Sequence, residues 1–252
     1  PLGSGAGYGS SIALNRQMTT DLLGFSSLAY NVVYAQMQRG KMEKNVLFGL
    51  AAVATTLGRL AADVCLFACN NFGFVHLPDK YTTGSSIMPH KKNPDVFELT
   101  RAKCNKIQAL PQQIILIMNN LPCGYFRDLQ IIKEVFLPAF EELKDCLRMA
   151  AYIINKIQVN EHILDDPKYD NMFSVEEVNR LATGGMPFRD AYKKVGLDIE
   201  AGKFTPDKRV HHTHEGSIGN LCNDKIHELM EQVWSGFNFA RTREAENRLL
   251  GR

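Results

Sequence analysis

Three stretches of the chain repeat apolar residues at steps of three and four, the spacing of α-helices with a buried face. The first covers 46–67, and the others cover 93–118 and 130–157. The second and third stretches contain interior prolines, Pro111 and Pro138. An interior proline removes a hydrogen bond and clashes with the preceding turn, so we expect Pro111 to kink or divide its helix.

The rest of the chain shows shorter and more polar helical patterns. Three short helices are predicted, the first with Ser174 and Glu177 spaced as in a capping box: 174–181, 187–195 and 220–234. No convincing run of alternating apolar and polar residues favours a β-strand. The pattern therefore predicts an all-α fold, with part of a long-helix bundle domain over 1–158 and a small C-terminal helical domain over 159–252.

The long helical stretches are apolar on more than one face. Such helices seldom bury themselves within a single chain. They usually form the core of a bundle that is built from several chains and that carries no chemistry of its own. We therefore expect these stretches to be the core of an oligomer.

Charge and hydropathy exclude some classes of protein. The 252 residues include 29 Lys and Arg against 27 Asp and Glu, which gives a formal net charge of +2. That near balance argues against binding nucleic acid or a membrane surface mainly by charge. No stretch reaches the roughly 18 uninterrupted apolar residues of a membrane span, and no signal peptide is visible. We expect a soluble, cytoplasmic protein.

The cysteines and histidines do not form a recognisable metal site. Six cysteines are scattered along the chain, and only Cys65 and Cys69 lie close, four residues apart. Without a CxxC pair or a spaced histidine, a zinc site is not expected. Single thiols in apolar helices are typical of buried cysteines in a reducing compartment. The cluster of His211, His212 and His214 is interpreted as part of a polar loop.

The candidate chemistry lies in the segment 83–94, which stands between two long helices and reads TGSSIMPHKKNP. It contains hydroxyls, lysines and a predicted helix start, with Asn93 as the N-cap and Pro94 in the first helical position. The free N–H groups and the dipole of a helix start favour negative charge. The segment is therefore a candidate anion site, with a mobile polar loop as the alternative.

Part of this segment resembles the signature loop of the fumarase/aspartase superfamily, whose pattern is GSSxMPxKxNP; here residues 84–94 read GSSIMPHKKNP. Five flanking segments resemble the argininosuccinate lyase family: PLGSGA at 1–6, FGFVHLPDKYTTGSS at 72–86, KKNPDVFELTRAK at 91–103, YFRDLQIIK at 125–133 and GMPFRDAYKKVG at 185–196. The resemblance implies a homotetramer with active sites shared between subunits and no metal or organic cofactor. It also implies reversible β-elimination of argininosuccinate to arginine and fumarate, in arginine biosynthesis.

The same resemblance implies catalytic roles for four residues. Ser85 is the implied general base that removes a Cβ proton of the succinyl group. Lys91 and Asn93 are the implied ligands of a substrate carboxylate, where fixed donors stabilise the aci-carboxylate formed in the reaction. Glu98 is the implied partner that orients a histidine near the leaving group.

Substrate contacts are implied for six residues, Ser86, Met88, Tyr125, Arg127, Gln130 and Lys133. A phenol, an amide and an ammonium group suit the carboxylates and the amino-acid end of argininosuccinate. Two alternatives stay open: Ser86 has a structural role, and Arg127 pairs with Asp128 to fix the start of the next helix.

The segment 31–40 departs from the family pattern NSxDAxSxRD. Asn31, Ala35 and Arg39 match it, whereas Val32, Tyr34 and Gly40 replace the serine and two aspartates. These changes either repack a helix or alter a substrate contact.

The catalytic histidine of the family stands in a Thr-His-x-Gln motif upstream of PLGSGA, and none of the seven histidines here has that context. We therefore expect a C-terminal portion of a longer chain, without its N-terminal domain and inactive by itself. The alternatives are another fumarate-releasing lyase, such as adenylosuccinate lyase, and a catalytically silent structural or assembly relative.

Overall fold

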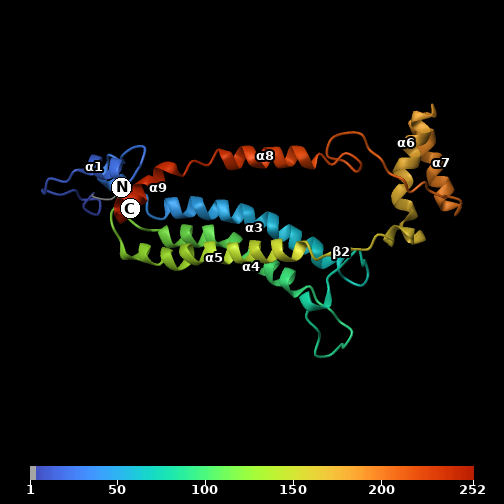
Figure 1. The fold of residues 1–252 in the computed structure, drawn as a ribbon, viewed down its shortest axis with the longest axis horizontal. Helices are drawn as coiled ribbons and strands as arrows, with labels where there is room; N and C mark the ends of the chain where they lie inside the picture. Colours follow the sequence, from blue (N-terminus) through green and yellow to red (C-terminus); the bar gives the residue numbers. More distant parts are fainter. Residues whose placement is uncertain (1–3) are drawn as a thin grey trace. The chain divides into compact units, whose positions relative to one another are not determined.

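The computed structural model describes residues 4–252, which form two compact units (Figure 1). The bundle unit contains the residues up to Asn160 together with Phe239–Arg252, and the C-terminal unit contains Glu161–Asn238. The described chain is mainly helical, so the predicted all-α class is confirmed. The division of the whole protein into domains at 158/159 stays a prediction.

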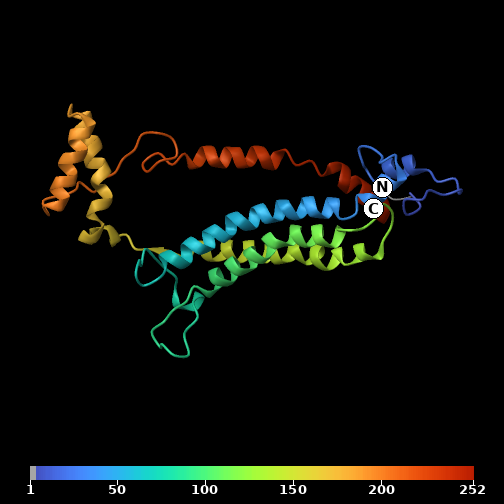
Figure 2. The same ribbon diagram turned by 180° about the vertical axis from the view of Figure 1, so that it is seen from behind.

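Three long helices form the core of the bundle unit (Figures 1 and 2). They are α3 (Lys41–Phe67), α4 (Asp95–Met118) and α5 (Ile132–Ile154), and α4 packs along both of the others. Their apolar stripes meet in one large cluster whose fully buried members include Leu47 and Ile107. A smaller cluster around Phe97 closes the end where α3 finishes and α4 begins. The apolar spacing of the sequence thus becomes an interhelical core.

Helix α4 continues without a break through Pro111, as α5 does through Pro138. Of the two outcomes expected at Pro111, division of the helix is therefore wrong, and a kink stays a prediction. Pro111 is itself buried, between Leu110 and Ile114 of the large cluster. The packing of these buried neighbours keeps the helix continuous, although the proline removes one backbone hydrogen bond.

Two predicted helix caps are also wrong. Helix α4 begins at Asp95 with Pro94 as its N-cap, because Asn93 is held one residue earlier by backbone pairing with Thr83. Helix α6 (Ser174–Thr183) already includes Ser174, since the preceding 3₁₀ turn (Pro167–Phe173) runs directly into it. Ser174 therefore lacks the extended backbone that an N-cap residue needs.

Short elements complete the bundle unit. Three helices lie in its terminal segments, α1 (Arg16–Leu22), α2 (Val32–Met37) and α9 (Ala240–Leu250). Arg241 of α9 donates a hydrogen bond of 2.8 Å to the carbonyl oxygen of Phe25, which joins the two ends of the chain. Two strands that the pattern did not predict, β1 (Val75–His76) and β2 (Gln158–Val159), pair antiparallel. Both are too short for alternation to be recognised.

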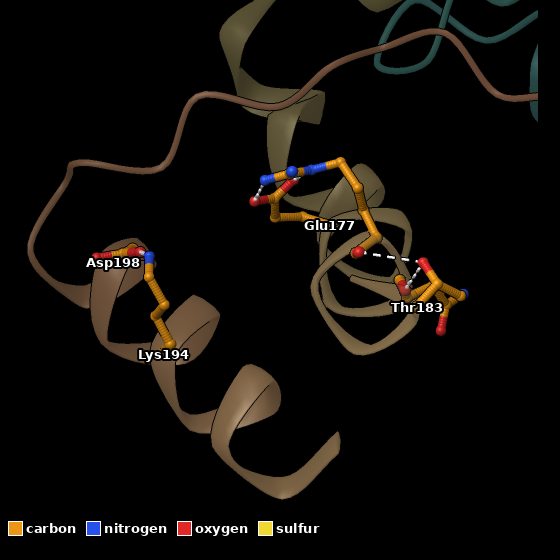
Figure 3. A network of polar contacts seen from close by, with 6 residues as sticks. Glu177, Thr183, Lys194 and Asp198 are labelled. Atoms are coloured by element: carbon orange, nitrogen blue, oxygen red, sulfur yellow. Dashed lines mark hydrogen bonds and ion pairs between the residues drawn. The ribbon is translucent and has the colours of Figure 1, made fainter. Parts of the chain in front are cut away.

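The C-terminal unit is built around the helix pair of α6 and α7 (Phe188–Glu200), preceded by two 3₁₀ turns and followed by α8 (Asn223–Ser235). Its small core contains Val178 of α6 and Val195 of α7. Each helix of the pair also carries an ion pair of its own, Arg180 with Glu177 and Lys194 with Asp198 (Figure 3). In contrast, α8 buries none of its residues within the described chain.

The bundle helices leave large apolar side chains exposed. Phe48 on α3, Leu99 on α4 and Leu137 on α5 are each more than half exposed. The stretch Val32–Phe67 also reaches a mean hydropathy of 1.6 over 18 residues, so by length and composition alone it could cross a membrane. A core helix passes the same test, and α3 contributes seven buried residues to the bundle. The exposed apolar faces fit the oligomer core expected from the sequence.

Substitution of Leu47 by alanine is expected to destabilise the bundle unit by about 3–5 kcal/mol, because it leaves a cavity at a fully buried site. Leu249→Ala is the matched control, since Leu249 is 74% exposed, and its expected effect lies within about 0.5 kcal/mol. Urea unfolding of both variants measures the difference. Equal destabilisation would contradict the assignment of Leu47 to the core.

The cysteines are expected to differ in their reaction with iodoacetamide at pH 8. Burial, and then the neighbouring thiol of Cys146, raise the pKa of Cys104 to about 11, so little of its reactive thiolate exists at that pH. Against the expectation of buried thiols, Cys123, which follows the end of α4, is exposed, and Cys65, Cys69 and Cys222 are only partly buried. Peptide mass spectrometry should find Cys123 alkylated first and Cys104 only after unfolding. Equal rates in the folded protein would refute this order.

Candidate functional site

The signature loop, residues 83–94, is the last part of the connection between α3 and α4 and follows β1 and a short 3₁₀ turn. Its two ends pair: Thr83 N–H donates to the Asn93 carbonyl oxygen at 3.1 Å, and Asn93 N–H donates to the Thr83 carbonyl oxygen at 2.9 Å. The Asn93 amide nitrogen adds longer bonds to the carbonyl oxygens of Thr83 and Gly84, at 3.3 and 3.4 Å. Hydrogen bonds therefore hold the two ends of the loop together, and the residues between them extend away from this pair.

Ser85 is partly buried near the start of this loop. Its Oγ accepts hydrogen bonds from the N–H groups of Ile87 and Met88, at 3.2 and 3.1 Å. Such donors stabilise negative charge on an oxygen. The fold of the loop thus offsets part of the reason why a serine hydroxyl is normally a poor base.

A cavity of about 290 Å³ lies beside the loop. It brings together three of the four predicted catalytic residues, Lys91, Asn93 and Glu98, while its opposite wall comes from the end of α3 and the following turn: Cys65, Ala68, Cys69, Asn70 and Asn71. Burial, and to a lesser extent the Glu98 carboxylate, raise the pKa of the Cys65 thiol. The cavity therefore presents a lysine, an amide and a carboxylate to one small ligand.

The two adjacent lysines of the loop have different partners. Lys92 forms an ion pair with Asp79, in the 3₁₀ turn Asp79–Tyr81 before the loop. Among the described residues, Lys91 forms no ion pair, so its ammonium group is available to an anion in the cavity. Sequence reasoning missed Asp79, because a partner thirteen residues away across a loop leaves no local pattern.

Ser86 and Met88 do not line this cavity. Both are exposed on the outer part of the loop. A substrate contact at either residue therefore requires a group that approaches the loop from outside the cavity.

The other predicted substrate contacts lie at the opposite end of α4. Gln130 donates a hydrogen bond of 3.0 Å to the Tyr125 hydroxyl, so these two polar groups act together. Arg127 and Lys133 are exposed nearby, and no ion pair between Arg127 and Asp128 occurs in the described chain. The alternative in which Arg127 and Asp128 pair is not supported.

The two sets of predicted residues are therefore far apart within one chain. Helix α4 has 24 residues, and at 1.5 Å per residue it spans about 36 Å between the signature loop and the segment with Tyr125. The loop and this segment lie at opposite ends of the bundle in both views (Figures 1 and 2). One chain cannot place both sets around one small substrate.

The divergent segment 31–40 lies near the Tyr125 end. The Asn31 side chain caps α2 by accepting the Tyr34 N–H at 2.9 Å, and Arg39 donates to the carbonyl oxygen of Leu129 at 3.3 Å. Gly40 has a φ of +80°, and a Cβ there would overlap the Met118 sulfur. At Gly40 the departure from the family pattern is thus a local backbone and packing change, because this φ favours glycine and a Cβ would displace the Met118 side chain.

Comparison with known proteins agrees with the motif. Residues 1–109 match a family described as Lyase. Over all 252 residues the chain is 75% identical to argininosuccinate lyase of Phocaeicola vulgatus and 76% identical to that of Bacteroides thetaiotaomicron. Argininosuccinate lyase of Stenotrophomonas maltophilia is 39% identical over 229 residues, which cover 90% of this chain and 53% of that protein.

Two solved structures show the same fold. EDDS lyase in complex with formate has a TM-score of 0.64 and 24% identity, covering 80% of this chain and 41% of its own. Class II fumarase from Schistosoma mansoni has a TM-score of 0.55 and 24% identity, covering 64% of this chain and 33% of its own.

The chain spans 56% of the length of the Phocaeicola and Bacteroides relatives, and it is matched from end to end. The resemblance first seen in the signature loop thus extends across both units. The chain belongs to the fumarase/aspartase superfamily, and its sequence is that of the argininosuccinate lyase family.

Proposed function

We propose that this chain supplies part of the active site of an enzyme that cleaves argininosuccinate reversibly into arginine and fumarate. The observation that carries the proposal is the grouping of Lys91, Asn93 and Glu98 around one cavity. Ser85, whose oxygen accepts two N–H donors, belongs to the same loop as Lys91 and Asn93. The name of the relatives that are 75–76% identical supports the choice of argininosuccinate among the possible succinyl substrates.

In the proposed reaction Ser85 removes a proton from the Cβ carbon of the succinyl group. The Lys91 ammonium and the Asn93 amide bind the neighbouring carboxylate and stabilise the aci-carboxylate that forms. The bonds of Asn93 within the loop are long, and its amide has two hydrogens, so it can turn one toward a substrate. Elimination of the arginine nitrogen from the adjacent carbon then gives fumarate.

Glu98 has a supporting role in this proposal. It lies at the cavity as a carboxylate that forms no ion pair with the residues described. A carboxylate in this position can hold a histidine in one tautomer and orientation near the leaving group. The histidine comes from outside this chain, because the family motif that carries it is not in the sequence.

The proposed assembly is a homotetramer whose active sites are shared between subunits. The exposed apolar faces of α3, α4 and α5 require a covering surface, and the opposite positions of the signature loop and Tyr125 require a second chain. Antiparallel contact between two copies would bring the loop of one chain beside Tyr125, Gln130 and Lys133 of the other. A reducing, cytoplasmic location fits the six free cysteines.

A chimera tests the proposed activity. The matching part of the Phocaeicola vulgatus relative is replaced by this chain, and fumarate release is followed by absorbance with argininosuccinate or adenylosuccinate as substrate. Turnover of argininosuccinate is expected. A folded, assembled chimera that releases no fumarate from argininosuccinate, or that prefers adenylosuccinate, would refute the proposal.

A further inference from the structure

The connection between α7 and α8 contains an ordered loop, residues 211–220, which we call the histidine loop. His212 N–H donates to the Ile218 carbonyl oxygen at 2.8 Å, and Gly216 N–H donates to the Asn220 carbonyl oxygen at the same distance. The Asn220 amide nitrogen donates to the Thr213 carbonyl oxygen at 2.9 Å. These hydrogen bonds hold the backbone of the histidine loop in one conformation and so restrict the positions of its side chains.

The His212 imidazole lies within hydrogen-bond distance of both a serine and a carboxylate. Its Nε2 lies 2.9 Å from Oε1 of Glu176 on α6, and its Nδ1 lies 2.6 Å from Oγ of Ser217. The side chains of His212 and Glu176 are 31% and 33% exposed, so water competes only partly for these bonds. The ring of His214 stacks on His212 with its centroid at 5.5 Å, which further restrains the imidazole.

The chemistry of the partners assigns the protons. A carboxylate only accepts hydrogen bonds, so in the neutral imidazole the hydrogen is on Nε2 and points to Glu176. Nδ1 then has a free lone pair, and the Ser217 hydroxyl must donate to it. A serine, an imidazole and a carboxylate follow one another in the same order in acyl-transferring enzymes on unrelated folds, although there the serine bonds to Nε2 and the carboxylate to Nδ1.

The backbone after Ser217 offers donors for a developing oxyanion. In the part of the chain that the structure describes, the N–H groups of Ile218 and Gly219 donate to no acceptor. N–H groups at or directly after a nucleophilic serine commonly stabilise the oxyanion in such sites. Gly219 has a φ of +97°, and a Cβ there would lie 2.6 Å from Nδ1 of His211. This φ favours glycine, and a Cβ would crowd the His211 ring.

A cavity of about 290 Å³ is lined in part by Glu176, Thr183 and His211, so the group borders it through Glu176, whereas Ser217 and His212 lie outside its lining. Two arginines also line it, but each is already neutralised: Arg180 by Glu177, and Arg209 by Asp207. Arg209 lowers the pKa of Asp207 to about 2, so that pair stays ionised at neutral pH. With both arginines neutralised and the Glu176 carboxylate in addition, the cavity favours an uncharged ligand over an anion.

We propose that Ser217, with His212 as general base and Glu176 as its orienting partner, is a second catalytic site that hydrolyses small uncharged esters. Ser217 Oγ attacks the ester carbonyl carbon while its proton passes to Nδ1 of His212. The bond to the alcohol oxygen breaks, and the alcohol leaves with that proton. Water then adds to the acyl carbon by the same route, which releases the acid and restores the serine. This activity is independent of the lyase reaction.

The test uses the 252-residue chain with two probes, an alkyl fluorophosphonate and p-nitrophenyl acetate. Peptide mass spectrometry is expected to find the phosphonate on Ser217, and p-nitrophenol release is expected to be lost in Ser217→Ala. His212→Gln should lower both rates about 10²-fold, because the general base is removed. Glu176→Gln should lower them about tenfold or more, because the preferred tautomer is lost.

Matched controls separate catalysis from folding. Ser235→Ala and His227→Gln alter a serine and an exposed histidine on α8, outside the proposed site, and both should retain the parent rates. Thermal unfolding is measured for every variant, and only variants with the parent transition are compared. Absence of label on Ser217, or equal labelling in the His212→Gln variant, would overturn the proposal.

Discussion

Replacement of Ser85 by alanine in the chimera is expected to slow fumarate release from argininosuccinate about 10³-fold, the effect of removing a well-placed general base. Alanine also removes the oxygen that accepts the N–H groups of Ile87 and Met88. The base of the signature loop should persist, since Thr83 and Asn93 form it through backbone bonds. The loss should therefore appear mainly in kcat.

Two measurements accompany this variant. Size-exclusion chromatography should show the parent assembly, and Ser235→Ala, on α8, should retain the parent rate. A Ser85→Ala variant that keeps even one tenth of the parent kcat would refute the role of Ser85 as the base. A variant that fails to assemble is replaced by Ser85→Thr, which keeps the accepting oxygen and should keep measurable turnover.

Mixing two inactive variants is expected to restore activity if the site is shared between chains. Ser85→Ala damages the signature loop, and Lys133→Met damages the segment about 36 Å away along α4. In mixed oligomers, about one quarter of the sites receive an intact loop from one chain and an intact Lys133 from another. Activity should therefore rise from near zero to about one quarter of the parent value.

The matched control is a mixture of Ser85→Ala and Lys91→Met. Both residues belong to the same loop, so every site in the mixture carries one defect and no recovery is expected. Each mixture is unfolded and refolded together so that subunits exchange, and fumarate release is then assayed. Recovery in the control, or none in the first mixture, would contradict a site shared between the loop of one chain and Lys133 of another.

The sequence predicted the helices best where their apolar pattern was long. It identified the cores of α3, α4 and α5, whereas it missed α1, α2, α9 and the two short strands. The predicted helix from Pro187 continues five residues beyond Val195, to Glu200. Short elements carry too few turns for a period to be recognised, and their ends depend on neighbours distant in sequence.

The candidate site was predictable as a set of residues, because the signature loop is contiguous. The roles of Ser85, Lys91, Asn93 and Glu98 stay predictions, and the cavity brings together the last three of these residues. The pairing of Lys92 with Asp79 was not predictable, and neither was the contact of Glu176 with His212. In each pair, the separation of the two residues in the sequence matches neither the helical nor the strand period.

The sequence by itself determined an all-α chain of the fumarase/aspartase superfamily, because helical periodicity and an eleven-residue motif are local properties of the chain. Only the tertiary structure decided that α4 continues through Pro111, and that Asn93 closes a loop instead of capping a helix. It also decided that the residues expected to share one substrate lie at opposite ends of a bundle. Packing and hydrogen bonds between residues apart in the sequence determine these features, and a local sequence pattern carries no information about such contacts.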